Sequence, residues 1–210
     1  MKVLLVNGSP HENGCTYTAL KEVSDTLNNN EIETEIIWLG TKPIPGCLGC
    51  GNCVKTGKCV ICDKVNEFLE KVPQCDGFIF GSPVHFAAIS GSMSSFLDRV
   101  FYGRRKLFSN KLGAGVVSCR RGGATSSFDE LNKYFGMNNM PIVTSQYWNM
   151  VHGTTPEEVK EDKEGMQTMR TLANNMAWLL KCIKAGKEMG IEFPKNEKII
   201  TTNFIEKNNI

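Results

Sequence analysis

Two kinds of hydrophobic pattern take turns along the chain: short continuous apolar runs, and apolar residues spaced three and four positions apart. Short, nearly continuous apolar or β-branched runs predict strands at residues 2–6, 33–39, 77–80, 114–118 and 141–144. Between them, apolar residues three and four positions apart predict helices at residues 16–27, 63–72, 92–101, 125–135 and 155–185. Strands that alternate with helices predict an α/β fold, a three-layer sandwich around a five-stranded parallel sheet.

The last predicted helix has a strong start signal. Thr155 can cap it, Pro156 suits its first position, and Glu158 can return a carboxylate to the cap. Core-facing positions follow at Met166, Met169, Leu172, Met176, Leu179 and Ile183. We therefore predict one domain over residues 1–190, followed by a tail, residues 191–210, whose weak pattern fits a late strand or an ordered arm.

Length and charge narrow the range of functions. A chain of 210 residues suits one domain with a sizeable core. Its 24 basic and 22 acidic residues give a formal net charge of +2, so the composition gives no reason to expect a nucleic-acid partner. The apolar runs are strand-sized, so we expect no membrane span, and residues 1–6 lack the layout of a signal peptide. We expect a cytoplasmic protein.

The nine cysteines are unevenly distributed. A reducing compartment disfavours disulfides, and an odd number cannot pair completely. Four of the cysteines form a C-x2-C-x2-C-x5-C run: Cys47, Cys50, Cys53 and Cys59. Four thiolates on such a glycine-containing loop can hold a [4Fe–4S] cluster, although the last spacing differs from that of ferredoxins.

Two alternatives to a cluster remain for this run. Zinc also binds four cysteines, usually as two separate C-x2-C pairs, and the thiols could stay without metal. Cys62 lies close enough in sequence to compete as a ligand or as a redox thiol. We expect Cys75, Cys119 and Cys182 to be small apolar residues of the core.

The segment between the first strand and the first helix, residues 7–16, has the chemistry of an anion site. A helix start offers unpaired N–H groups and a positive dipole end. Gly8 and Gly14 allow a tight backbone path, and side-chain donors come from Ser9, His11, Asn13 and Thr16. The glycine spacing matches neither a Walker loop nor a dinucleotide fingerprint, so a phosphate monoester is the candidate ligand. A polar turn that only caps the helix is the alternative.

Two further loops follow predicted strands. Residues 81–86 combine a proline turn with His85 and Phe86, which can contact a flat heterocycle. Residues 119–123 place Arg120 and Arg121 before two glycines, a cationic rim for a ring carbonyl or a second anion. Each alone could be an ordinary loop. Because the carboxyl ends of parallel strands share one edge of the sheet, we expect all three loops to converge there.

These three loops, together with residues 147–150 (Tyr-Trp-Asn-Met), resemble the NADPH-dependent FMN reductase and iron–sulfur flavoprotein branch of the flavodoxin-like superfamily over about residues 1–185. The resemblance implies a flavodoxin-like fold that binds FMN. It assigns the FMN phosphate to Ser9, His11, Asn13, Gly14, Cys15 and Thr16. It assigns the isoalloxazine ring to Pro83, Val84, His85 and Phe86 and to the loop of Arg120, Arg121 and Gly122.

Three residues depart from the usual family pattern. His11 stands where arginine or lysine is usual, Cys15 where asparagine or serine is usual, and His85 where tyrosine is frequent. Histidine is a weaker, pH-dependent cation, and a thiol is a poor hydrogen-bond donor. We therefore expect the phosphate to be bound less tightly than is usual in the family. The cysteine run is similar to that of iron–sulfur flavoproteins, in which a [4Fe–4S] cluster passes electrons to FMN.

The resulting hypothesis is an FMN-dependent oxidoreductase. It would take a hydride from NAD(P)H and pass electrons to a flavin, a quinone, another small acceptor or the cluster. The chemistry would lie on FMN, with no catalytic side chain. The alternatives are an electron carrier that exchanges electrons with ferredoxin, and a domain that has lost its cofactor. The resemblance also implies a homodimer or higher homo-oligomer, with residues 147–153 as a candidate contact or lid.

Overall fold

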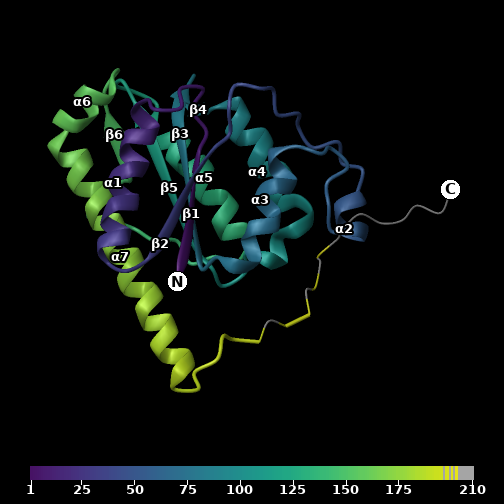
Figure 1. Ribbon diagram of the computed structural model, residues 1–210. Coiled ribbons are helices and arrows are strands. Elements are labelled where there is room, and N and C mark those ends of the chain that lie inside the picture. Colours follow the sequence, from purple (N-terminus) through teal and green to yellow (C-terminus); the bar gives the residue numbers. More distant parts are fainter. Residues whose placement is uncertain (196, 199, 201, 203–210) are drawn as a thin grey trace.

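The computed structural model describes residues 1–195, 197–198, 200 and 202, which form a six-stranded sheet between two helical layers (Figure 1). The strands are β1 (Lys2–Asn7), β2 (Glu33–Trp38), β3 (Gly77–His85), β4 (Ala88–Ile89), β5 (Leu112–Cys119) and β6 (Met150–His152). Five of them run parallel in the order β2-β1-β3-β5-β6, and β4 pairs antiparallel with β3. This order, with its reversal beside β1, is that of flavodoxin-like sheets, so the predicted fold class is confirmed.

The helices cover the sheet as the apolar stripes predict. The α-helices are α1 (Cys15–Asn29), α2 (Asn52–Thr56), α3 (Lys64–Lys71), α4 (Gly91–Arg104), α5 (Ala124–Met137), α6 (Pro156–Glu161) and α7 (Lys163–Glu188), with 3-10 turns η1 (Val72–Gln74) and η2 (Arg105–Leu107). Helices α1, α6 and α7 lie on one face of the sheet, and α3, α4 and α5 lie on the other (Figure 1). Successive residues of β1 serve opposite faces: Val3 and Leu5 pack toward α1 and α7, whereas Leu4 and Val6 pack toward α3 and α4.

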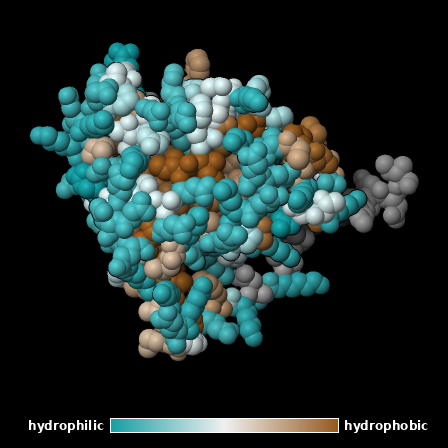
Figure 2. All heavy atoms as spheres, viewed as in Figure 1, coloured by the Kyte–Doolittle hydropathy of each residue, from teal (hydrophilic) through white to brown (hydrophobic). Residues whose placement is uncertain are grey.

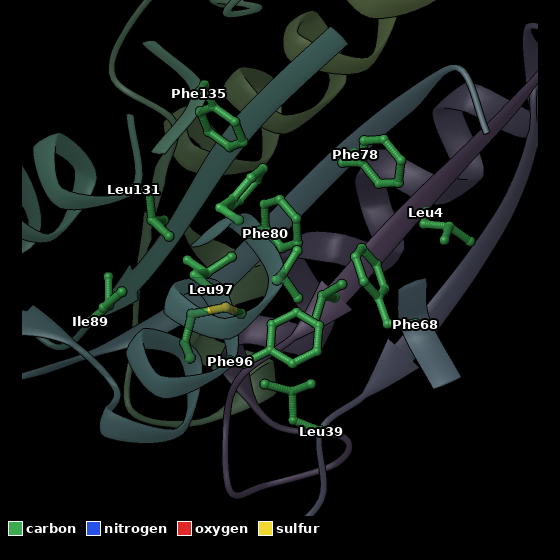
Figure 3. Packing of buried hydrophobic residues seen from close by; sticks show 14 of the residues in the cluster. Leu4, Leu39, Phe68, Phe78, Phe80, Ile89, Phe96, Leu97, Leu131 and Phe135 are labelled. Carbon is green, nitrogen blue, oxygen red and sulfur yellow. The ribbon is translucent and has the colours of Figure 1, made fainter. Parts of the chain in front are cut away.

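Aromatic side chains dominate the core on the side of α3, α4 and α5 (Figure 3). Phe68 of α3 and Phe96 of α4 meet edge to face, with ring centroids 5.2 Å apart. Both also approach Phe80 of β3. Full burial of such a ring contributes about 1.5–3 kcal/mol. This packing fixes α4 firmly against the sheet, and α4 is the helix that touches both candidate sites described below.

The fifth parallel strand is not the one predicted. Residues 141–144 make only one isolated bridge, between Ile142 and Gly113 at the start of β5. The chain then leaves the sheet and returns as β6, in which Met150 pairs with Val117 near the end of β5. Ser145 holds the excursion by hydrogen bonds of its Oγ to the Tyr147 carbonyl (2.6 Å) and to Asn149 Oδ1 (2.7 Å). A run of four apolar residues could not reveal that the edge strand is interrupted.

The last predicted helix is also divided. It breaks at Asp162, whose Oδ1 accepts from the Gly165 N–H at 2.9 Å and caps α7, while its Oδ2 accepts from the His152 N–H at 2.7 Å. Thr155 caps α6 as predicted, and the Glu158 carboxylate accepts from the Thr154 N–H at 2.6 Å, one residue before the cap. The described residues of the tail, 191–195, 197–198, 200 and 202, form no helix or strand. The rest of the predicted arm lies outside the described residues.

None of the helices in the described part of the chain combines the length and apolar character that a membrane crossing requires.

Candidate functional site

The loop between β1 and α1 is shaped by its own buried side chains. Asn7 donates from Nδ2 to the Glu12 carbonyl (3.0 Å) and accepts at Oδ1 from the Ser9 N–H (3.0 Å). The Ser9 Oγ in turn accepts from the His11 N–H at 3.1 Å. Asn7 and Ser9 are buried, whereas His11 is exposed. The loop is therefore held in one shape before any ligand arrives.

Neighbouring elements fix the same loop from outside. The Gly8 N–H donates to the Gly81 carbonyl of β3 (2.9 Å), and the Gly8 carbonyl accepts from the Ser90 hydroxyl before α4 (2.7 Å). Trp38, the last residue of β2, donates its indole N–H to the Ser9 carbonyl at 2.8 Å. Trp38 and Ser90 were not among the residues that the sequence pattern predicted for the site. Trp38 lies near the end of a predicted strand and Ser90 lies before a predicted helix, so their positions alone could have indicated that they reach the same edge of the sheet.

The N-terminus of α1 opens toward this loop. Gly14 precedes the helix with no side-chain cap, and the first turn carries no acidic residue. Among the described residues, the N–H groups of Cys15, Thr16 and Tyr17 have no protein acceptor. Free donors at a helix start favour an anion.

Thr16 and Cys15 differ in what their side chains offer. The Thr16 hydroxyl is buried and lies 2.8 Å from the Ser118 hydroxyl at the end of β5. The Cys15 Sγ instead faces the Gly153 carbonyl at 3.7 Å, and burial raises the pKa of this thiol. Cys15 therefore stays a neutral thiol near pH 7 and offers its backbone N–H to the loop. Ser118 was likewise not among the residues predicted for the site.

The second predicted loop is mostly strand. Gly81, Ser82 and Pro83 continue β3, because residues 116–118 of β5 lie alongside and pair with them; on the other side, only Gly81 pairs with β1. The expected turn after residue 80 is therefore wrong, and Val84 and His85 also belong to β3. The turn itself is at Phe86 and Ala87, whose φ angles of 51° and 60° close a tight hairpin to β4. Phe86 is fully exposed at its tip.

The third loop lies against this hairpin. Gly123 has a φ of 84°, and a Cβ there would be 2.9 Å from the Ala87 Cα. The Ser126 hydroxyl donates to the Ala87 carbonyl at 2.6 Å. Arg120, Arg121 and Gly122 are exposed beside this contact. The charge of Arg120 is one of the smaller causes that lower the pKa of Glu158, after the hydrogen bonds from Thr154, so Arg120 lies toward α6.

All three predicted segments therefore meet at one edge of the sheet. A cavity of about 430 Å³ opens there beside the third loop. It is lined on one side by Arg121, Gly122 and Gly123 and on the other by Tyr147, Trp148 and His152. The volume lies in the range of small-molecule sites. The predicted lid, residues 147–153, is thus partly cavity wall and partly the strand β6.

The cysteine run lies away from this edge. Cys47, Cys50, Cys53 and Cys59 line one small hollow together with Arg99 and Tyr102. In the described ranges, no three His, Cys, Asp or Glu side chains converge closely enough to hold a metal ion. Four thiols around one hollow still have the donor chemistry of a cluster site. Gly49, Gly51 and Gly57 have φ angles of 63–80°, and these left-handed turns let the loop bend around that hollow.

Helix α4 separates the two regions. Ser90, just before its first residue, holds the Gly8 carbonyl of the first loop. Gly103, near its end, lies so close to Cys53 that an added Cβ would be 2.1 Å from the sulfur. Thirteen residues of helix span about 20 Å. Figure 1 likewise shows α2 far from the sheet edge at which β3 and β4 end.

The remaining cysteines do not behave alike. Cys75 and Cys119 are buried, as predicted, and burial raises the pKa of both thiols. Cys182 is exposed on the outer side of α7, so the prediction that it belongs to the core is wrong. Leu179 and Ile183 of the same helix pack against the core, but Cys182 lies between them on the exposed side.

Comparisons with known proteins agree with this architecture. A model of the NADPH-dependent FMN reductase family matches residues 1–155. The iron-sulfur flavoprotein MJ1083 of Methanocaldococcus jannaschii is 34% identical over 196 residues, which cover 88% of this chain and 100% of that protein. An iron-sulfur flavoprotein of Methanosarcina thermophila is 26% identical over 90% of this chain and 100% of its own length.

Two solved structures share the fold at low sequence identity. RosB, with bound 8-demethyl-8-formylriboflavin-5'-phosphate, superposes with a TM-score of 0.67 at 15% identity, over 99% of this chain and 95% of RosB. A flavodoxin from the domain Archaea gives a TM-score of 0.58 at 12% identity, over 86% of this chain and 99% of the flavodoxin.

Proposed function

The chain belongs to the NADPH-dependent FMN reductase family, and from that premise we propose that this FMN-dependent oxidoreductase takes a hydride from NADH or NADPH and passes electrons to a small acceptor, such as a flavin or a quinone. The observation that carries the proposal is the uncapped N-terminus of α1, with three free N–H groups beside buried hydroxyls, at the edge where three loops meet. FMN, when bound, supplies hydride and single-electron chemistry. The chain needs only to hold it, orient it and admit its partners.

We propose that the phosphate binds at the start of α1. The hydroxyls of Ser9 and Thr16 and the N–H groups of residues 15–17 would donate to it. His11 and Asn13 are exposed at the loop surface and would close over the anion from outside. The inner donors are already positioned by Asn7 and Ser118, so binding orders few groups. Charge-assisted hydrogen bonds of this kind contribute about 1.5–3 kcal/mol each.

We propose that the flavin ring lies against the β3–β4 hairpin and the loop of Arg121 and Gly122. The exposed Phe86 at the hairpin tip can cover an aromatic surface. The cavity between Arg121 and Trp148 would then receive the nicotinamide or the small acceptor beside the ring. Because its walls include Arg121 and two exposed aromatic residues, Tyr147 and Trp148, a planar ring on a molecule that also carries an anionic group suits it.

We further propose that the cysteine run holds a [4Fe–4S] cluster. The support is the shared hollow of the four thiols and the likeness to proteins named iron-sulfur flavoproteins. Cys47, Cys50, Cys53 and Cys59 would be the ligands, and the cluster would supply single-electron transfer. The thiols must draw together around it, since in the described ranges they do not already converge.

The cysteine run favours a second candidate function, an electron carrier that exchanges electrons with ferredoxin instead of NAD(P)H. Leu48, Val54 and Val60 are exposed in this part of the chain. The space-filling view shows hydrophobic spheres over the loop that leads to α2 (Figure 2). An exposed apolar surface around a redox centre suits docking of a redox protein.

We also propose that the protein acts as a homodimer or higher homo-oligomer. Within one chain, the first loop and the cysteine run lie about 20 Å apart along α4. A second copy could bring its own cysteine run closer to the flavin edge. The exposed Tyr147 and Trp148 beside the cavity are candidate contacts. Light scattering of the FMN-loaded protein should give at least twice the mass of one chain, and a monomer would contradict this proposal.

Anaerobic stopped-flow reduction tests the choice between the two functions. The FMN-loaded protein is mixed with NADH, NADPH or reduced ferredoxin, and bleaching of the flavin band is followed. Fast bleaching by a nicotinamide supports the reductase, and bleaching by ferredoxin alone supports the carrier. The Cys53→Ser variant is the matched control, because it should lose the ferredoxin route while the nicotinamide route remains.

A further inference from the structure

Cys59 is held by two helices at once. Asn66 of α3 pairs with its backbone: Oδ1 accepts from the Cys59 N–H at 2.9 Å, and Nδ2 donates to the Cys59 carbonyl at 3.0 Å. Arg99 of α4 donates from Nη2 to the Cys59 Sγ at 3.3 Å. Among the described residues, no side chain donates to the sulfur of Cys47, Cys50 or Cys53. Cys59 is therefore the fixed member of the run.

The same arginine ties together the two ends of the cysteine loop. Its guanidinium donates to the Pro45 carbonyl before the run (3.3 Å) and to the Ile61 carbonyl after it (3.1 Å). It also forms a two-pronged ion pair with Asp63, at 2.6 and 2.8 Å. Asp63 in turn caps α3. A planar guanidinium can serve this many acceptors at once, and a lysine ammonium cannot.

Burial makes this contact electrostatically strong. The Arg99 side chain is only 1% exposed, and it forms part of the wall of the hollow that the four cysteines share. Its Nε is buried and has no partner among the described residues. A buried donor without an acceptor is costly, and an anion in the adjoining hollow would supply one. Asp63 carries the opposite charge, so Arg99 offers the cysteine run its direct N–H···S bond and its unpartnered Nε–H.

We propose that Arg99 is a positioning residue for the iron–sulfur cluster, which presents Cys59 as the fixed ligand and raises the reduction potential of the cluster. This inference rests on the proposed cluster site. A cluster with four thiolate ligands is an anion, and reduction adds one further electron to it. A buried cation and an N–H···S bond stabilise the more negative reduced form more than the oxidised form. The potential therefore rises when Arg99 is present.

The experiment compares four proteins after anaerobic reconstitution with iron and sulfide: wild type, Arg99→Gln, Arg99→Lys and Arg104→Gln. Arg104 is the matched control, because it lies against Gly57 of the same loop but donates to no cysteine sulfur in the described residues. An EPR-monitored redox titration gives the midpoint potential of the cluster, and iron per FMN gives its occupancy. The FMN content reports folding, since the phosphate loop lies at the other end of α4.

Arg99→Gln should shift the midpoint potential to more negative values and reduce iron per FMN, with FMN content unchanged. Arg99→Lys should shift the potential less, because it keeps the positive charge but loses the planar guanidinium with its several N–H donors. Arg104→Gln should stay near wild type. Equal potentials in Arg99→Gln and Arg104→Gln would overturn the inference. If Arg99→Gln retains no iron, its potential cannot be measured, and the midpoint potential of the Arg99→Lys cluster is the test. A wild-type potential in Arg99→Lys contradicts the inference. Failure of the wild type to take up iron overturns the proposed cluster instead.

Discussion

The phosphate loop (residues 7–16) and the cysteine loop (residues 47–59) both contain glycines and follow parallel strands, but they are built differently. The phosphate loop is held by partners from β2, β3 and β5, such as Trp38, and by Ser90 just before α4. In the cysteine loop, Cys47 and Cys50 are exposed, and of its four cysteines only Cys59 has side-chain hydrogen-bond partners from outside the loop in the part of the chain that the structure describes.

This difference indicates two ways of binding a cofactor. A loop that is fixed beforehand loses little conformational entropy when its ligand arrives, so its few hydrogen bonds are used efficiently. A loop with free thiols takes its final shape from the metal, and the coordination energy also orders the chain. We therefore expect FMN binding to survive damage to the cysteine loop, and cluster binding to depend on each thiol.

Removal of one thiol should have the largest effect. Cys53→Ser replaces one of the four ligands, and we expect a loss of nearly all cluster iron with FMN content unchanged. Iron, sulfide and FMN analysis of anaerobically purified protein measures this. Cys62→Ser is the control, because Cys62 is exposed just outside the run and should be dispensable. Iron loss in Cys62→Ser, with iron retained in Cys53→Ser, would show that the ligand set is misassigned.

Removal of phosphate donors should have the next largest effect. Ser9→Ala and Thr16→Ala each delete a buried hydroxyl at the start of α1. Each should weaken FMN binding by about 1.5–3 kcal/mol, roughly ten- to hundredfold in Kd. Fluorescence titration of the FMN-free protein measures Kd. Ser24→Ala, on α1 but bonded to Thr34 away from the loop, should leave Kd unchanged. If all three variants bind FMN equally, the phosphate lies elsewhere.

A more moderate effect is expected from crowding the phosphate loop. A Cβ at Gly8 would lie 2.7 Å from the Met93 Cε and 3.2 Å from the Gly81 carbonyl oxygen. Gly8→Ala should therefore lower the free energy of unfolding by about 1–3 kcal/mol in urea melts. Gly136→Ala is the control, since nothing lies within 4 Å of the added methyl group and helical alanine is favourable. A stable Gly8→Ala protein would mean that the loop is less rigid than its contacts indicate.

The smallest effect concerns thiol chemistry in the two loops. Burial raises the pKa of Cys15, so this thiol stays protonated at pH values at which exposed thiols begin to ionise. In FMN-free, metal-free protein at pH 8, iodoacetamide should label Cys15 several-fold more slowly than Cys47. The difference should shrink as the pH rises through the raised pKa. Mass spectrometry of the labelled peptides measures both rates, and equal rates at pH 8 would contradict the burial of Cys15.

Local patterns predict most of the fold. The apolar positions of β1, α1 and α4 face the core because period and burial are set by neighbouring residues in sequence. Features that depend on distant partners were missed. The sequence of residues 81–85 predicts a turn, yet these residues continue β3 because β5 pairs with residues 81–83 and β4 pairs with residues 84–85. Asp162 breaks a helix because it also binds His152.

The candidate site divides in the same way. Loops at strand ends could be found from sequence, because parallel strands bring their carboxyl ends to one edge. The residues that hold these loops, Ser90, Ser118 and Trp38, act across 29–102 positions of sequence. Arg99 reaches Cys59 across 40 positions. No periodicity links such pairs, so only the folded chain reveals them.

The most direct test of the central claim is the cofactor content of the protein purified without oxygen. Quantitative FMN, iron and sulfide analysis of one sample, with its visible absorbance spectrum, covers both loops together. We expect one FMN per chain with about four iron and four sulfide. FMN without iron, after anaerobic reconstitution as well, would contradict the proposed cluster and leave a simple flavin reductase. Absence of FMN would contradict the assignment of the phosphate loop itself.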